Sequence, residues 1–166
     1  MPLNLLKKYP QLLEIAYLDD FNRKKSLKGV FNRDIVTNDS FMFKKKQINP
    51  TTKNGEIPMD TLFTHLITVE VDKKTKRREF EYERSIRLHW IKYHIEERKT
   101  NNVLKFSLKE LHGYRTYIYD RDQKYVIVLE PYRNNLEYYL LTAYYLKGRN
   151  VKKMENKYRR KLSDLL

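Results

Sequence analysis

The sequence contains no cysteine among its 166 residues. Structural disulfides and thiolate zinc sites are therefore excluded. It has only four glycines, and it contains no phosphate-binding Gly-rich loop, dinucleotide fingerprint or HExxH zinc motif. No apolar run approaches the roughly 20 residues that a transmembrane helix needs, and the first residues lack the pattern of a secretory signal. We therefore expect a soluble, cytoplasmic protein with no membrane partner.

A cluster of carboxylates is also missing. Metal-dependent nucleases usually group carboxylates, alone or with histidines, around Mg²⁺ or Zn²⁺. Asp120 and Asp122 fit a turn, and Glu130 closes a strand before Pro131. The sequence thus predicts neither a metal site nor a cofactor.

The composition is strongly basic. Lys and Arg number 35 against 21 Asp and Glu, which gives a formal net charge of +14, and there are 14 tyrosines. A basic surface attracts polyanions, and interleaved aromatic rings can stack on unpaired bases. The alternative is that many lysines simply form a solvated surface. The size of the excess favours RNA as the partner.

The stretch from Arg115 to Tyr145 predicts three consecutive antiparallel strands. It is rich in Val, Ile, Tyr and Thr, which suit strands, and turn-forming residues interrupt it at 120–123 and 131–135. In the last strand, alternation places Tyr139, Leu141, Ala143 and Tyr145 on one face and Leu140, Thr142 and Tyr144 on the other. We expect the Ala143 face to pack on helices. The opposite face should then be open and carry Thr142 and Tyr144 beside Arg115, Tyr117 and Tyr119.

The remaining elements complete an α+β fold in which N-terminal helices pack on a four-stranded antiparallel sheet. Helical spacing covers 3–18 around Pro10, 20–35, 59–66 and 82–97, and strands are expected at 41–48 and 103–108. The segment 67–82 fits either a hairpin or a charged loop that leads into a helix. Residues 49–58 have the composition of a loop. This organisation gives a helical N-terminal region at 1–57, an α+β core at 58–150 and a basic, helical C-terminal tail at 151–166.

A helix of the form RxxRLHWI, whose two arginines are Arg84 and Arg87, precedes three strands with the sequences RTYIY, YVIVLE and YYLLTAYY. Together they resemble the phage-associated nucleases of the Barnase–EndoU–colicin–RelE superfamily, over roughly Thr61 to Lys147. The resemblance implies a metal-independent endoribonuclease, a toxin or effector of phage or mobile-element origin. It makes transfer RNA a candidate substrate and an acidic immunity protein a candidate partner.

Metal-independent cleavage of RNA needs a group that takes the proton of the attacking 2′-hydroxyl, a proton donor for the leaving oxygen and cations on the phosphate. His65, in LFTHLIT, resembles an HLT-type element of these nucleases and ranks first among the four histidines; a packing role at a helix end is its alternative. His89 is expected in the interior, His94 near a helix end and His112 in a loop.

The other candidate site residues are phosphate and base ligands. Arg115 can bind phosphate oxygens, Thr142 can donate a hydrogen bond to one, and Tyr144 can donate or stack on a base. Arg84 and Arg87 reach the same phosphate or pair with Glu81 and Glu83. Tyr117 and Tyr119 complete the expected substrate-binding set. Two other functions remain open: a catalytically inactive RNA-binding or phage structural protein, and an interaction module for an acidic partner.

Overall fold

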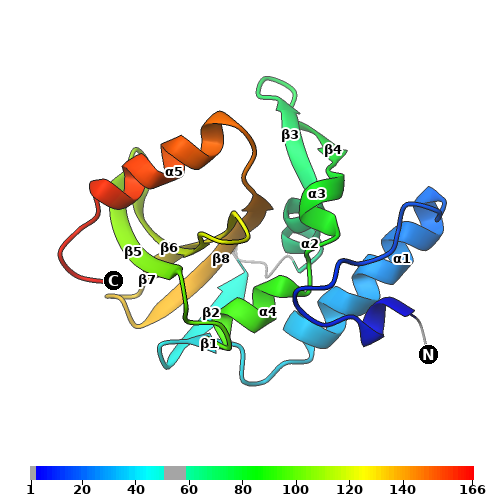
Figure 1. Cartoon of the computed structure of the whole chain (residues 1–166), viewed down its shortest axis with the longest axis horizontal. Helices are drawn as coiled ribbons and strands as arrows, with labels where there is room; N and C mark the ends of the chain where they lie inside the picture. Colours follow the sequence, from blue (N-terminus) through cyan, green and yellow to red (C-terminus); the bar gives the residue numbers. More distant parts are fainter. Residues whose placement is uncertain (1–2, 51–58) are drawn as a thin grey trace.

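A six-stranded mixed sheet organises the protein, as seen in a computed structural model that describes residues 3–50 and 59–166 (Figure 1). The strand order is β1-β2-β8-β7-β6-β5. The strands are β1 (Met42–Phe43), β2 (Lys46–Pro50), β5 (Val103–Glu110), β6 (Gly113–Asp120), β7 (Tyr125–Tyr132) and β8 (Glu137–Tyr145). A separate two-stranded hairpin consists of β3 (Thr68–Asp72) and β4 (Arg77–Phe80).

The α+β class is confirmed, but a sheet of four antiparallel strands is wrong. Strands β5 to β8 pair in sequence order and antiparallel, as expected. The free edge of β8 then takes β2 as a parallel neighbour, and β1 pairs antiparallel with β2. An edge strand exposes unpaired N–H and C=O groups, and β2 satisfies those of β8. Sequence patterning could not foresee this pairing because the two strands lie far apart in the chain.

Helices cover one face of the sheet. They are α1 (Asp20–Phe31), continued by a π-helical turn over Asn32–Val36, α2 (Met59–Ile67), α3 (Tyr82–Ser85) and α4 (Trp90–Ile95). Their apolar residues share one core with the sheet, built around large buried side chains such as Phe31, Phe63, Trp90, Tyr125 and Tyr138. Ala143 lies in this core, which confirms the expectation that its face packs on helices. Strands β1 and β2 contribute Phe43 and Ile48, so the region 1–57 and the following residues share this core.

Helix α5 (Arg149–Arg159) covers the opposite face of the sheet. The prediction that this face is open to solvent is therefore wrong. The helix buries Met154 against Phe106, Tyr117, Tyr119 and Val126, and Figure 1 shows it lying across β5 and β6. Gly148 has a φ of 53°, a left-handed conformation that favours glycine, at the turn between β8 and this helix. The expected C-terminal helix is therefore present, and it forms part of the fold.

The local expectations have mixed outcomes. Of the two alternatives for 67–82 the structure has the hairpin, and the helices at 20–35 and 59–66 are confirmed. The helix expected over 82–97 is divided into α3 and α4 by a turn at Ile86–His89, which buries Ile86, Leu88 and His89 together. Within the described part of 3–18, helical structure is limited to a 3₁₀ turn at Leu3–Leu6. A loop is also expected at 49–58, but residues 51–58 lie outside the described residues.

No helix among the described residues is long and apolar enough to cross a membrane.

Candidate nucleic-acid interface

Arg84 lies at the junction of α2, α3, the hairpin and β8. Its Nη1 donates to the backbone carbonyls of His65, at 3.0 Å, and Thr68, at 2.8 Å. The same nitrogen lies 3.3 Å from Thr142 Oγ1, and the guanidinium carbon is 5.8 Å from the centre of the Tyr144 ring. The side chain is only 12 % exposed. Arg84 therefore joins Thr142 and Tyr144 to the C-terminal end of the helix that carries His65.

A second guanidinium converges on the same carbonyl. Arg78, on β4, donates from Nη2 to the Thr68 carbonyl at 3.0 Å and from Nε to Thr68 Oγ1 at 2.8 Å. Burial lowers the pKa of Arg84; the Glu81 carboxylate opposes this, and the positive charge of Arg78 adds to it. Glu81 Oε2 lies 3.5 Å from Arg84 Nε, which has no hydrogen-bond partner among the described residues. The two guanidiniums concentrate positive charge beside the Thr68 carbonyl, and this charge favours an anion nearby.

A cavity of about 340 Å³ opens between Arg84, the end of β8 and α5. We call it the α5 cleft; its lining residues are Arg84, Tyr144, Leu146, Asn150, Lys153, Met154 and Lys157. Three of these side chains are cationic and none is acidic. The cleft therefore combines positive charge, a tyrosine ring and an apolar floor, which suits a phosphate-bearing ligand.

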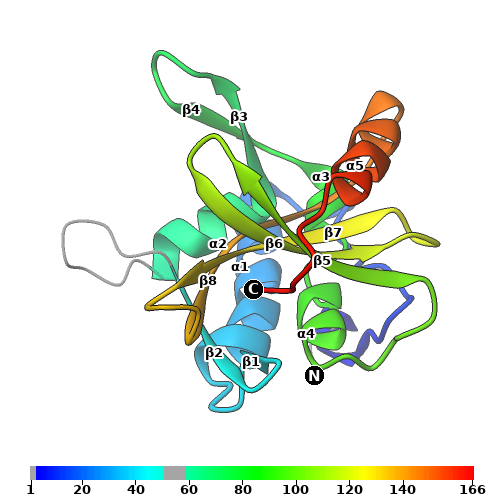
Figure 2. The ribbon, with the colours of Figure 1, turned by 90° about the vertical axis from the view of Figure 1, so that its left-hand side faces the viewer.

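Two basic projections flank the cleft. The hairpin and α5 extend beyond the same end of the sheet in both views (Figures 1 and 2). Helix α5 carries five Lys or Arg residues and one Glu, and four of the five cations are exposed. The turn of the hairpin adds the exposed cations Lys73, Lys74, Lys76 and Arg77. Such flanks raise the local concentration of a polyanion near the cleft.

Lys157 fixes the inner wall of the cleft. Its Nζ donates to Glu110 Oε1 and to the Tyr117 hydroxyl, at 2.5 and 3.1 Å. Tyr117 in turn donates to the same Glu110 oxygen at 2.6 Å. Burial raises the pKa of Tyr117, and the hydrogen bond to Glu110 raises it further. Tyr117 therefore stays a neutral hydroxyl that holds α5 to the sheet.

This role corrects the expected substrate-binding function of two tyrosines. Tyr117 and Tyr119 are 3 % and 1 % exposed because α5 packs over them. Burial raises the pKa of Tyr119 to about 12, and a contact with Glu155 of α5 adds to the shift. Neither ring can stack on a base while α5 is in place.

The faces of β8 follow the expected alternation only in part. A register shift opposite Val128 and Leu129 leaves Leu141 as an extra residue in β8. Thr142 and Tyr144 lie on the α5 side, as expected, but Leu140 packs in the helix-side core and Leu141 against the α5-side cluster. A β-bulge shifts the phase of the alternation, so the predicted faces of Leu140 and Leu141 are wrong.

Arg115 does not join the group around Arg84. Its Nη1 pairs with Glu130 Oε2 at 2.5 Å. Thr116, which follows Arg115 on β6, is level with Leu129 and, beyond it, Leu140, so Arg115 lies toward the start of β8 and Tyr144 toward its end. Arg115 therefore pairs with Glu130 and does not line the α5 cleft with Tyr144, which differs from the expected convergence.

Arg87 also belongs to a different environment. It is 9 % exposed, and its Nη1 donates to Glu83 Oε2 at 2.9 Å. Its guanidinium carbon lies 4.0 Å from the centre of the Tyr145 ring, whose residue follows Tyr144 on β8. Of the two arginines expected to reach one phosphate, only Arg84 lines the α5 cleft.

The four histidines occupy distinct places. His65 is half-buried in the last turn of α2, and its carbonyl binds Arg84. His89 and His94 are buried, as expected for the first, and His112 is exposed beyond the end of β5. None of the four lines the α5 cleft as far as the structure describes it. His65 remains the candidate that is connected to the cleft, through Arg84.

The sequence predicted a basic helical tail but did not identify the cations of α5, or Arg78, as residues of the site. A signal for α5 was present, since Val151, Met154 and Tyr158 recur at helical spacing and pack on the sheet, while Lys153 and Lys157 are one turn apart.

Among the described residues, no group of three or more His, Asp or Glu side chains could hold a metal ion. The lining of the cleft offers three cationic side chains, one hydroxyl and one amide without a carboxylate, a set that suits an anion better than a metal ion. Comparison with protein-family models, curated proteins and solved structures finds no match.

Proposed function

We propose that this protein binds RNA in the α5 cleft and cleaves it without a metal ion. The observation that carries the proposal is the gathering of Arg84, Lys153 and Tyr144 around one cavity, with Thr142 hydrogen-bonded to Arg84. The excess of positive charge over the whole chain, +14, is consistent with a polyanionic substrate.

A phosphate at the mouth of the cleft would contact cations from two elements. Arg84 approaches from α3, and Lys153 from the exposed surface of α5. Burial raises the pKa of Tyr144, so its hydroxyl keeps its proton and can donate to a phosphate oxygen. Cations and neutral donors of this kind stabilise the extra negative charge that develops during phosphate transfer.

In the proposed reaction the 2′-hydroxyl attacks the adjacent phosphorus. His65 takes the hydroxyl proton and later releases it to solvent, a P–O bond forms to the 2′-oxygen, and the bond to the 5′-oxygen breaks as that oxygen takes a proton from water. The products are a 2′,3′-cyclic phosphate and a 5′-hydroxyl. A phage or mobile-element effector that acts on transfer RNA is the biological setting that the sequence resemblance suggests.

The experiment is incubation of purified protein with end-labelled RNA in EDTA, together with anisotropy measurements of RNA binding. Wild-type protein should release 2′,3′-cyclic phosphate ends from RNA and leave DNA intact. Lys153→Gln should weaken RNA binding about tenfold, because it removes an exposed cation of the cleft. Lys109→Gln is the matched control, since Lys109 is an exposed lysine of β5 outside the cleft lining.

Two variants separate binding from chemistry. His65→Ala should reduce the cleavage rate by about 10²-fold and leave RNA affinity within about threefold, as expected for loss of a general base. Thr142→Ala should reduce the rate by about tenfold, because a neutral donor contributes less than a cation. Cleavage that requires added metal ions, or that is unchanged in both variants, would contradict the mechanism.

An RNA-binding protein without catalysis is the second candidate. The observation that favours it is the absence of histidines from the lining of the α5 cleft, within the described residues. If the wild-type protein binds RNA tightly and in a salt-sensitive way but cleaves no RNA, that result would support this candidate over the first.

A further inference from the structure

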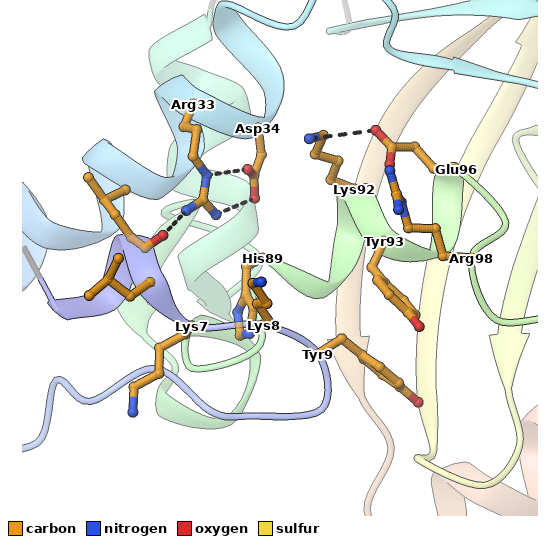
Figure 3. Close-up of a pocket in the computed structure, with 12 residues that line it drawn as sticks. Lys7, Lys8, Tyr9, Arg33, Asp34, His89, Lys92, Tyr93, Glu96 and Arg98 are labelled. Atoms are coloured by element: carbon orange, nitrogen blue, oxygen red, sulfur yellow. Dashed lines mark hydrogen bonds and ion pairs between the residues drawn. The ribbon is translucent and has the colours of Figure 1, made fainter.

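A second and larger pocket lies on the helix side of the sheet, remote from α5 in the chain. It has a volume of about 440 Å³ and is lined by Leu5, Leu6, Lys7, Lys8, Tyr9, Arg33, Asp34, His89, Lys92, Tyr93, Glu96 and Arg98. Figure 3 shows the Arg33–Asp34 pair on one side of this His89 pocket and the Tyr9 and Tyr93 rings on the other. Its volume falls within the range of small-molecule sites.

His89 is the unusual member of the lining. It is only 5 % exposed, and among the described residues its ring nitrogens make no hydrogen bond of ordinary geometry. Burial lowers its pKa to about 4; a looser hydrogen-bonding contact with the Gln11 backbone opposes the shift, and the positive charges of Arg33 and Lys7 add to it. Near pH 7 the ring is therefore neutral and offers one N–H donor and one acceptor nitrogen. Buried polar groups are nearly always paired, so a polar ligand edge that completes the pairing of this ring fits this position.

The charges around the pocket favour an anionic ligand. Five cationic side chains line it against two carboxylates. Arg33 is held by Asp34 and by the Leu5 carbonyl, and Arg98 donates to Glu96 at 2.8 Å. Lys92 makes only a loose pair with Glu96, at 3.6 Å. Lys8 has no ion pair within the described chain, so these two lysines are available to a phosphate.

The opposite wall is aromatic. The rings of Tyr9 and Tyr93 stack on each other with centroids 4.4 Å apart. The Tyr9 hydroxyl donates to Asp120 Oδ2 at 2.9 Å, which fixes the orientation of that ring. A rigid aromatic wall beside a neutral imidazole suits a planar heteroaromatic ring.

We propose that the His89 pocket binds a nucleoside monophosphate group, either free or at the 5′ end of an RNA. The base lies against the tyrosine wall with its polar edge at His89, and the phosphate contacts Lys8 and Lys92. This site is separate from the α5 cleft in its residues, so it stands whether or not the protein cleaves RNA.

The test is calorimetry with adenosine 5′-monophosphate and with a 5′-phosphorylated trinucleotide. Saturable binding of either ligand, at least about tenfold tighter than that of inorganic phosphate or adenosine alone, is expected. Binding should shift the NMR signals of the His89 imidazole, a readout that needs no substitution. Lys92→Gln should weaken binding about tenfold, whereas Lys109→Gln should not change it.

The variants also separate the two proposals. Lys153→Gln should weaken RNA binding in the α5 cleft and leave mononucleotide affinity unchanged. Lack of saturable binding of both phosphorylated ligands, equal affinity for inorganic phosphate, or binding that leaves the His89 signals unmoved would overturn the proposed site.

Discussion

Replacement of Asp120 by asparagine should destabilise the protein strongly at neutral pH. Asp120 is fully buried at the end of β6, and its carboxylate is paired on both oxygens. Oδ2 lies 2.7 Å from His94 Nε2 and 2.9 Å from the Tyr9 hydroxyl. Oδ1 accepts from Lys99 Nζ at 2.7 Å and from the backbone N–H of Gln123 at 3.2 Å.

The magnitude follows from this pairing. Removal of one partner of a buried ion pair costs about 3–5 kcal/mol, because the buried donors around it lose their charged acceptor. For a protein of this size each kcal/mol lowers the Tm by about 2–4 °C, so Asp120→Asn should lower it by roughly 6–20 °C. Asp122→Asn is the matched control: Asp122 shares Lys99, at 3.2 Å, but its side chain is 44 % exposed. Exposed pairs contribute about 0–1 kcal/mol.

The pH dependence has a definite sign. Burial alone would raise the pKa of Asp120, but the hydrogen bonds from His94, Lys99, Gln123 and Tyr9 hold it well below the ordinary value of 3.8. A group whose pKa is depressed on folding contributes stability above its unfolded pKa and loses it as the pH falls through the folded pKa. The stability difference between wild type and Asp120→Asn should therefore be full at pH 7 and decrease below about pH 4.

The assay is urea denaturation at several pH values, with thermal unfolding as a second measurement. Equal stability of the Asp120→Asn and Asp122→Asn variants at pH 7 would refute the reasoning. A wild-type advantage over Asp120→Asn that grows as the pH falls from 7 to 3 would refute the sign of the linkage.

Three further predictions concern the cleft and the sheet. RNA affinity should fall about 50-fold between 50 and 200 mM salt if four phosphates of a single strand are contacted, as measured by anisotropy; a flat dependence would exclude phosphate contacts. Arg115→Ala should change the rate of RNA cleavage less than about threefold, because this guanidinium pairs with Glu130; a loss of about 10²-fold would place it in the site. Leu140→Ala should cost about 2–5 kcal/mol in urea denaturation and Leu141→Ala clearly less, since Leu140 is fully buried and Leu141 only half-buried; the reverse order would contradict the bulge.

Local patterns predicted the strands well but not their neighbours. The hairpins of β5 to β8 follow from short turns and β-rich runs, which are local in sequence. The parallel pairing of Ile48 with Tyr138 joins segments about 90 residues apart, and no local signal encodes it. The bulge at Leu141 was equally hidden, because an alternating run such as YYLLTAYY does not show where an extra residue enters.

The candidate site was predicted in part. The sequence placed Thr142 and Tyr144 on one face and named Arg84 as a ligand, and these three residues do meet. The sequence favoured Arg115 over the other arginines because it shares a face of the sheet with Thr142 and Tyr144. However, Glu130 on the adjacent strand pairs with Arg115. Face assignments cannot reveal which cation already has a counterion.

The largest error concerned α5, and its physical cause explains the form of the site. The sequence shows a basic tail, and a basic tail read alone suggests a free, solvated segment. The same helix buries Met154 on the sheet, so it closes the face that was expected to bind RNA. It also brings the exposed Lys153 to the edge where Arg84 and Tyr144 lie, beside Lys157, which pairs with Glu110. Binding is therefore expected at the border of the covered face, where one helix supplies both the apolar contacts that hold it and the cations that face the ligand.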